Sequence, residues 1–278
     1  MVTKTSPGVA LITGASTGIG SVYADRLARR GYDLVLVARN GKLLQTLATR
    51  IQNQTGRAVE VIAADLSDTR GLATVEAKLR SDANITLLVN NAGVASAAPL
   101  ADSDADQMSA MIALNVTALT RLTQAVIPGF IARKSGAIIN IASIVALAPE
   151  LLNGVYGGSK AFVLAFSQSL LHELGSKGIR VQAVLPGATR TPLWALSGVD
   201  IDTVLPGNVM TAEDMVDASL VAFDNGEFAT IPALPNIADW NAFESARQAL
   251  MPNLSKAKPA ARYATATSGT EKARAAIA

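Results

Sequence analysis

The sequence predicts an α/β protein whose core is a doubly wound parallel sheet of about seven strands with helices on both faces. Short runs of β-branched and aliphatic residues alternate with amphipathic stretches from the start of the chain. This alternation is typical of parallel strands that are buried on both faces and joined by helices. No internal repeat is visible, and no linker rich in proline, glycine or serine divides the chain before residue 250.

The individual elements follow from this alternation. Strands are expected at residues 9–13, 32–38, 58–63, 85–89, 137–141, 179–184 and 228–231. Helices are expected at residues 18–30, 41–53, 68–80, 104–133, 155–175 and 211–224. Thr211 and Asp214 form a capping-box pattern at the start of the last helix. Right-handed crossovers applied to this order place ligands at the carboxyl ends of the strands, near the point where the strand order reverses.

Residues 1–250 are expected to form one domain. Residues 251–278, rich in alanine, lysine, threonine and serine, are expected to be an extension whose role the sequence does not indicate. Trp194 follows the turn after the sixth predicted strand and suggests an apolar surface facing the substrate, although a plain core patch would have the same composition.

Composition excludes several classes of function. The 278 residues carry a formal net charge of +2, and no basic stripe interleaved with aromatic residues is present, so no nucleic-acid surface is expected. The chain has no cysteine and a single histidine, His172. Disulfides, thiol nucleophiles and histidine-based metal sites are therefore not expected. The partners that remain are small molecules.

The sequence also gives an expectation about location. The segment before residue 9 lacks the apolar stretch of a signal peptide. The most apolar window, residues 136–152, is interrupted by Asn140 and Glu150 and is shorter than the ~20 apolar residues that a membrane span needs. We therefore expect a cytoplasmic protein without a membrane segment.

A glycine-rich turn follows the first predicted strand at residues 13–20, in which Gly14, Gly18 and Gly20 are the glycines. Glycines allow the backbone to turn sharply and to approach a pyrophosphate at the positive end of a helix. Such a turn can also be an ordinary entry into a helix. Its place after the first strand of an alternating α/β chain favours a Rossmann-type dinucleotide site.

The end of the second predicted strand indicates which dinucleotide binds. NAD enzymes usually carry an acidic residue there, about 20 residues after the glycines. Here the positions are Ala38 and Arg39. The guanidinium of Arg39 can pair with a 2′-phosphate, so NADP(H) is favoured over NAD(H). The alternative is that Arg39 is only a solvated side chain at a strand end.

Together these segments resemble the short-chain dehydrogenase/reductase family over roughly residues 8–235. The resemblance is carried by the glycine turn at 13–20, Asp65-Leu66, the segment Asn90-Asn91-Ala92-Gly93, Asn115, Ser143, Tyr156-Gly157-Gly158-Ser159-Lys160, Pro186-Gly187, Thr189 and Thr191. Each motif is weak alone, but their order and spacing together are specific. The resemblance implies an NADP(H)-dependent oxidoreductase acting on a carbonyl or secondary alcohol of a small, apolar substrate. It also implies a homodimer or homotetramer, and a lid near residues 193–210 that covers the substrate.

The resemblance further implies which residues hold the cofactor. Asp65 and Leu66 would flank the adenine, and Asn91, Ala92 and Gly93 would line the cofactor after the fourth strand. The other positions implied as cofactor-binding are Gly14, Ser16, Thr17, Gly18, Ile19, Gly20, Arg39, Tyr156, Lys160, Pro186, Gly187, Thr189 and Thr191. Thr191 would contact the nicotinamide carboxamide, and Ile19 would lie near the nicotinamide. Asn91 and Gly93 are also common in simple strand-terminal turns.

The chemistry would rest on four residues. Tyr156 and Lys160 are four residues apart on a predicted helix and so share a face. A nearby ammonium would lower the pKa of the Tyr156 phenol from its usual ~10 and allow proton transfer near neutral pH. In the family pattern Ser143 donates a hydrogen bond to the substrate oxygen, and Asn115 supports a water-linked proton path that includes Lys160.

Two other functions use the same motifs. A protein that senses NADP(H) without catalysis would share the cofactor motifs but would not need the set Asn115, Ser143, Tyr156 and Lys160. An epimerase or dehydratase on a related scaffold typically differs in its glycine spacing. The sequence therefore favours an oxidoreductase and leaves its substrate open.

Overall fold

The structure is a computed structural model that describes residues 7–197 and 199–263. It divides the chain into two compact units, of which the first ends at Ala233 and the second begins at Leu234. The sequence placed this division at residue 250 instead. The helix that begins the second unit, α10 (Ile237–Ala249), was not predicted, because only Trp240 among its residues is buried and the apolar pattern is correspondingly weak.

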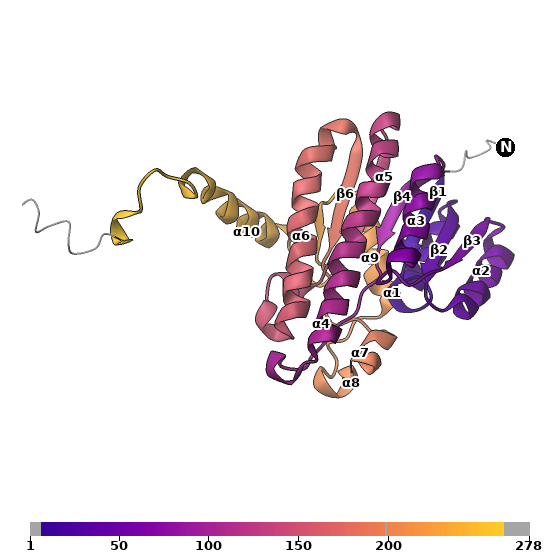
Figure 1. Ribbon diagram of the computed structural model, residues 1–278, viewed down its shortest axis with the longest axis horizontal. Helices are drawn as coiled ribbons and strands as arrows, with labels where there is room; N and C mark the ends of the chain where they lie inside the picture. The colour runs from indigo at the N-terminus through magenta and orange to yellow at the C-terminus, as the bar shows by residue number, and fades with distance from the viewer. Residues whose placement is uncertain (1–6, 198, 264–278) are drawn as a thin grey trace, which may run out of the picture. The chain divides into compact units, whose positions relative to one another are not determined.

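The part of the first unit that the structure describes contains one seven-stranded sheet (Figure 1). Its strands are β1 Val9–Thr13, β2 Asp33–Ala38, β3 Val59–Ala63, β4 Ile85–Asn90, β5 Gly136–Ile141, β6 Ile179–Val184 and β7 Ala229–Thr230. They lie in the order β3-β2-β1-β4-β5-β6-β7, and every neighbouring pair is parallel. The predicted Rossmann-type sheet is confirmed, and the strand order reverses between β1 and β4.

Helices cover both faces of the sheet. One face carries α1 (Gly18–Arg29), α2 (Gly41–Thr55) and α9 (Ala212–Asp224), and the other carries α3 (Thr69–Ser81), α5 (Leu119–Arg133) and α6 (Gly154–Leu174). The side chains of β1 alternate between the two cores: Ala10 and Ile12 belong to the first, and Leu11 to the second. As predicted, the Thr211 hydroxyl caps α9 by accepting from the Asp214 amide at 3.0 Å.

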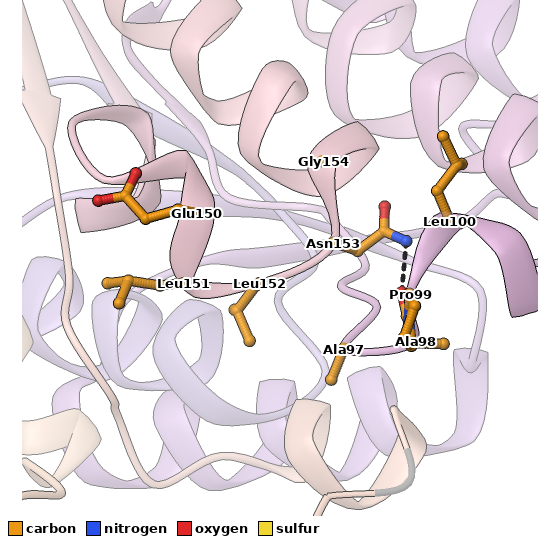
Figure 2. A pocket seen from close by; sticks show the side chains of 9 residues that line it. All are labelled: Ala97, Ala98, Pro99, Leu100, Glu150, Leu151, Leu152, Asn153 and Gly154. Carbon is orange, nitrogen blue, oxygen red and sulfur yellow. Dashed lines mark hydrogen bonds between the residues drawn. The ribbon is translucent and has the colours of Figure 1, made fainter.

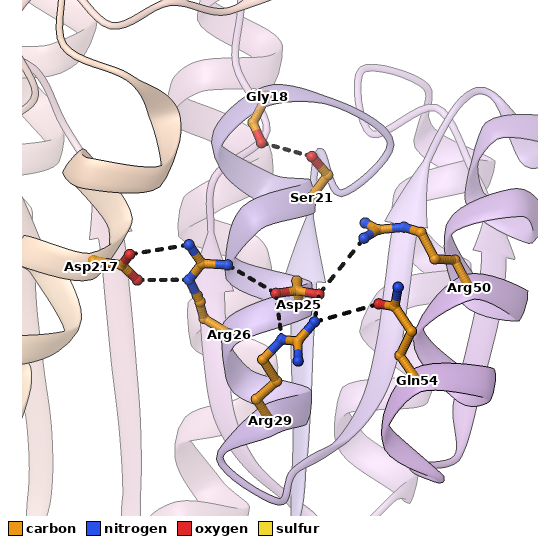
Figure 3. Close-up of polar contacts among 8 residues, drawn as sticks. All are labelled: Gly18, Ser21, Asp25, Arg26, Arg29, Arg50, Gln54 and Asp217. Carbon is orange, nitrogen blue, oxygen red and sulfur yellow. Dashed lines mark hydrogen bonds and ion pairs between the residues drawn. The ribbon is translucent and has the colours of Figure 1, made fainter.

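A buried carboxylate connects the three helices on the first face (Figure 3). Asp25 of α1 is 6% exposed and accepts hydrogen bonds from Arg26 and Arg29, each at 2.9 Å. Arg50 of α2 lies 3.7 Å from the same carboxylate, and Arg26 also reaches Asp217 of α9 at 2.7 Å. This network fixes α1, whose amino end forms part of the glycine turn.

The segment predicted as one helix over residues 104–133 has three parts. They are α4 (Ala105–Ile112), a π-helical turn (Ala113–Ala118) and α5. By length and composition alone, Ala105–Arg133 is the one helix among the described residues that could cross a membrane. Within the protein, 44% of its most apolar window is buried, and α5 packs on α3 and the sheet. This is the environment of a core helix.

The remaining elements are short. The predicted lid carries α7 (Pro192–Leu196) and α8 (Ile201–Val204). Single 3₁₀ turns lie at Leu100–Asp102, Ile144–Ala146, Pro149–Leu151, Gly175–Lys177, Met251–Asn253 and Ala261–Tyr263. Of the predicted extension 251–278, residues 264–278 lie outside the described part of the chain.

Candidate active site

The predicted site residues gather where the strands end. The glycine turn follows β1, Arg39 follows β2, Asn91 follows β4, Ser143 follows β5 and Pro186 follows β6. All these strands are parallel, so their carboxyl ends lie at one edge of the sheet. This edge includes the switch point between β1 and β4, where doubly wound sheets bind nucleotides.

The glycine turn closes tightly on the segment after β4. Gly14 has φ +65° and Gly18 has φ +55°, conformations that favour glycine. A Cβ on Gly20 would lie 2.3 Å from the carbonyl oxygen of Gly14, so only glycine fits there. The side chain of Asn91 donates to the carbonyls of Thr13 (2.9 Å) and Gly14 (3.2 Å). Asn91 therefore braces the turn as well as lying at the predicted cofactor edge.

The amino end of α1 has the properties of an anion site. Thr17 is the N-cap residue but makes no side-chain capping bond, and no acidic residue lies in the first turn. By contrast, Asn40, Asp68 and Asn153 each cap their helices through the side chain. Thr17 is exposed, Ser16 and Ile19 are half-buried, and the first amides of α1 have no side-chain acceptor. These features fit the pyrophosphate of a dinucleotide.

Arg39 and Asp65 share the next part of the edge. Arg39 is exposed immediately after β2. The pKa of Asp65 is held below its usual value mainly by the Ser67 hydroxyl, with a contribution from the positive charge of Arg39. Leu66 is 4% exposed and belongs to the core on the second face of the sheet. The Arg39 side chain is therefore exposed and is accessible to a phosphate.

Ser143 and Tyr156 lie close together. Tyr156 lies in the first turn of α6 and is 7% exposed, and Ser143 follows β5. The Ser143 side chain lies close enough to the Tyr156 phenol to act on its pKa, which it lowers. Ser143 also accepts from the Val145 amide at 3.3 Å and lies 3.4 Å from the Pro186 carbonyl oxygen. The end of β5 and the first turn of α6 therefore bring the two side chains to the same part of the site.

The electrostatics of this pair differ from the sequence-based expectation. Burial raises the pKa of Tyr156, and the Ser143 side chain opposes that rise. Burial also lowers the pKa of Lys160 from 10.5 to about 8. The Lys160 Nζ lies 5.9 Å from the centre of the Tyr156 ring and donates to the Ile141 carbonyl at 2.8 Å. The expected lowering of the phenol pKa is therefore not found, because desolvation is the largest influence on Tyr156 and outweighs the contribution of Ser143.

Asn115 lies in the π-helical turn and forms hydrogen bonds with the segment after β4. Its side chain accepts from the Val94 amide (3.0 Å) and donates to the Val94 carbonyl (2.9 Å) and to the Ser159 hydroxyl (3.0 Å). A Cβ on Gly93 would lie 3.1 Å from the Asn115 amide oxygen and 3.5 Å from the Lys160 Nζ. Gly93, Asn115 and Lys160 are therefore neighbours, although the Asn115 side chain contacts Val94 and Ser159 and not Lys160.

Sequence analysis missed the contribution of Asn153, which is 3% exposed. Its side-chain oxygen accepts from the amides of Val155 (2.9 Å) and Tyr156 (3.4 Å), so it caps α6. Its amide nitrogen donates to the Ala98 carbonyl at 2.6 Å, as Figure 2 shows, and to the Ser103 hydroxyl at 3.1 Å. An asparagine just before the Tyr156 helix was a recognisable capping signal.

The segment after β6 completes the edge. Pro186 accepts from the Ile144 amide at 3.0 Å, and the Thr189 hydroxyl bonds the Gly187 carbonyl at 3.1 Å. Thr191 contacts the glycine turn, since a Cβ on Gly18 would lie 3.1 Å from its methyl group. The indole of Trp194 donates to the Thr189 carbonyl at 2.8 Å. Trp194 thus anchors the base of the predicted lid.

A cavity of about 250 Å³ lies at the amino end of α6 (Figure 2). It is lined by residues 97–100 and 150–154. Leu152 belongs to this lining and also packs on the apolar cluster of Met108, Met111, Val145 and Tyr156. Leu100 and Leu151 of the lining are 63% and 57% exposed. The lining thus mixes exposed leucines with the polar side chains of Glu150 and Asn153, and Leu152 connects it to the cluster that contains Tyr156.

Comparisons with known proteins agree with this site. The family model for short chain dehydrogenases matches residues 8–202. The 17-beta-hydroxysteroid dehydrogenase type 3 of Homo sapiens is 35% identical over 213 residues, which cover 76% of this chain and 66% of that protein. The fold and the site define a nucleotide-binding oxidoreductase that uses a nicotinamide cofactor and acts on CH–OH groups. The chain belongs to the short-chain dehydrogenase family.

Two solved structures are similar over nearly the whole chain. A short-chain dehydrogenase from Sphingobium yanoikuyae in complex with NADPH is 50% identical, with a TM-score of 0.89, covering 92% of this chain and 100% of that one. The bulky-bulky ketone specific alcohol dehydrogenase from Comamonas testosteroni is 44% identical, with a TM-score of 0.87, covering 94% of this chain and 100% of that one.

Proposed function

We propose that the protein transfers hydride reversibly between NADP(H) and ketones or secondary alcohols that carry two bulky, apolar substituents. The observation that carries this proposal is the convergence of three buried side chains, Tyr156, Ser143 and Lys160, where the strands end, with the Lys160 Nζ 5.9 Å from the centre of the Tyr156 ring. The similarity to a ketone-specific alcohol dehydrogenase supports the substrate class, and Leu100 and Leu151, exposed in the lining of the nearby cavity, offer apolar contacts.

In this proposal each residue of the site has one task. The nicotinamide cofactor supplies the hydride when it is bound at the switch point. Tyr156 donates its proton to the oxygen that becomes negative, and Ser143 donates a hydrogen bond to the same oxygen. Lys160 supplies positive charge beside the phenolate that Tyr156 becomes when it has lost its proton. Asn115 positions the Val94 segment and Ser159 beneath the substrate, through the hydrogen bonds described above.

NADP(H) is proposed over NAD(H) because of the end of β2. Ala38 stands where an acid would bind a free ribose hydroxyl, and Arg39 is exposed beside it. The Sphingobium yanoikuyae relative was solved with NADPH, which supports the same preference. The double variant Ala38→Asp with Arg39→Leu tests it. We expect the ratio of kcat/KM for NADPH over NADH to fall at least tenfold, and an unchanged ratio would remove Arg39 from the proposal.

The catalytic assignment is tested with Tyr156→Phe. Loss of the hydroxyl is expected to lower kcat by about 10²–10⁴-fold on a panel of diaryl and aryl-alkyl ketones, while NADPH binding, measured by fluorescence, persists. Tyr32→Phe is the matched control, since Tyr32 precedes β2 at the opposite edge of the sheet. Full turnover by Tyr156→Phe would refute the assignment. NADPH binding by wild type without turnover of any ketone would support a sensor instead.

We also propose, from the sequence alone, that the protein works in the cytoplasm as a homodimer or homotetramer. Fractionation of the source cells would test the location. Sedimentation equilibrium would test the oligomeric state, and a monomer at micromolar concentration would contradict it.

A further inference from the structure

Four polar side chains are buried together in the core between the sheet and the helices α5 and α6. Asn90 of β4 is 3% exposed, and Asn140 of β5, Thr123 of α5 and Ser167 of α6 are each 0% exposed. The surrounding core is aliphatic, and it includes Ile138, whose side chain lies on the same face of β5 as that of Asn140. Polar groups buried among aliphatic side chains cost free energy unless they are hydrogen-bonded. The four residues therefore have to be understood through their hydrogen bonds.

These hydrogen bonds connect two strands to two helices. The side-chain amide of Asn90 donates to the Asn140 Oδ1 at 2.9 Å and to the Thr123 hydroxyl at 3.0 Å. The side-chain amide of Asn140 donates in turn to the Ser167 hydroxyl at 2.9 Å. The Ser167 hydroxyl donates to the Val163 carbonyl at 2.7 Å, within α6. Asn140 thus connects β4, through Asn90, to α6.

Ser167 lies on the same face of α6 as the catalytic candidates. Tyr156, Lys160, Val163 and Ser167 follow one another at spacings of four, three and four residues, which places them on one side of the helix. All four are buried. A hydrogen bond at Ser167 therefore acts on the side of α6 that carries the reactive groups.

The helix α6 is attached to two consecutive residues of β5. The Asn140 side chain donates to Ser167, and the Lys160 Nζ donates to the carbonyl of Ile141 at 2.8 Å. Ser143 follows the same strand. Aliphatic contacts are non-directional and allow a helix to slide, whereas a hydrogen bond weakens steeply when its geometry changes. The Asn140–Ser167 bond therefore fixes the position of α6 along β5.

The other end of the chain of hydrogen bonds leads to the cofactor edge. Asn90 is followed directly by Asn91, whose side chain donates to the carbonyls of Thr13 and Gly14. The strand β4 therefore carries one asparagine that braces the glycine turn and, beside it, one that bonds Asn140. The same buried bonds connect the part of the site expected to hold the cofactor to the part that carries Tyr156.

We propose that Asn140 and Ser167 are positioning residues, whose hydrogen bond sets where Tyr156 and Lys160 lie relative to Ser143. This inference rests on the proposed hydride transfer, in which Tyr156 and Ser143 act on one substrate oxygen. A displacement of about 1 Å in a reacting group can lower a rate about 10²-fold. The bond between Asn140 and Ser167 therefore acts on the rate without either residue contacting the substrate.

The kinetic test compares Ser167→Ala with Thr123→Val. Each variant removes one hydroxyl that accepts a hydrogen bond from a buried asparagine, but Thr123 lies on α5, which carries none of the proposed catalytic residues. Ser167→Ala should lower kcat by at least about tenfold and leave the KM for NADPH unchanged, because α6 moves while the glycine turn stays in place. Thr123→Val should keep the wild-type kcat. A wild-type kcat in Ser167→Ala, or an equal loss in both variants, would overturn the proposal.

A titration of Lys160 tests the position of α6 without any substrate. Burial lowers the pKa of Lys160 from 10.5 to about 8, so a displaced helix that admits water should raise its midpoint toward 10.5. NMR of protein labelled with ¹³C at the lysine Cε follows this titration, and the signal is assigned by its loss in Lys160→Met.

The midpoint should rise in Ser167→Ala and stay at the wild-type value in Thr123→Val. An unchanged midpoint in Ser167→Ala, or the same rise in both variants, would overturn the proposal. If the wild type turns over no ketone, the proposed function fails, and this titration alone decides whether Asn140 and Ser167 position the helix.

Discussion

Asn153 gives the sharpest test of how the active-site helix is held. Asn153→Ala removes a helix cap, worth about 1 kcal/mol, and two buried hydrogen bonds to Ala98 and Ser103, worth about 1 kcal/mol each. We therefore expect the free energy of unfolding to fall by about 3 kcal/mol. Because Tyr156 lies in the capped turn, kcat should fall as well, even though Asn153 does not touch the proposed reacting oxygen.

The measurement is urea unfolding followed by circular dichroism, with two variants for comparison. Asn40→Ala removes an exposed cap with one bond, to the Leu43 amide at 3.0 Å, and should cost only about 1 kcal/mol. Asn153→Asp keeps the capping oxygen and loses the donors, so its cost should be intermediate. If Asn153→Ala costs no more than Asn40→Ala, the bonds to Ala98 and Ser103 do not stabilise the protein, and the reasoning fails.

Two further predictions concern pH. The folded pKa of Lys160, lowered by burial to about 8, lies below that of the unfolded chain, so the free energy of unfolding should rise by up to about 3 kcal/mol between roughly pH 8 and 10.5. Lys160→Met should lack this rise in denaturant titrations, and a rise of equal size in the variant would contradict the prediction. Burial acts to raise the pKa of Asp25, but hydrogen bonds from Arg29 and Arg26 outweigh it and hold that pKa below its usual value. Asp25 should therefore stabilise the fold near neutral pH, and its contribution should be lost as pH falls through the folded pKa. We expect Asp25→Asn to cost about 2 kcal/mol at pH 7, with the difference from wild type shrinking in acid; a constant difference would count against it.

The sequence predicted the elements that are strongly buried. All seven strands were found within one or two residues, because strands covered on both faces must be apolar throughout. The glycine turn was predicted as well, since φ values of +65° at Gly14 and +55° at Gly18 leave glycine as the favoured residue. The order of the motifs was enough to indicate the family.

Other features were invisible in the sequence. The π-helical turn around Asn115 interrupts a segment whose apolar pattern reads as one continuous helix. Helix α10 buries only Trp240, so its sequence shows no clear helical periodicity of apolar residues. The cavity at the amino end of α6 arises from two loops whose sequences, residues 97–100 and 150–154, carry no motif.

The sequence by itself thus determined the sheet and the positions of the strand ends, and its motifs predicted Ser143, Tyr156 and Lys160 as site residues. Only the tertiary structure decided how these groups act on each other. It showed that Ser143 lies near the Tyr156 phenol, that Asn153 holds the first turn of α6, and that burial raises the pKa of Tyr156 where proximity to Lys160 was expected to lower it. The reason is physical: periodicity and motifs are local properties of a chain, whereas desolvation depends on every segment that packs around a group.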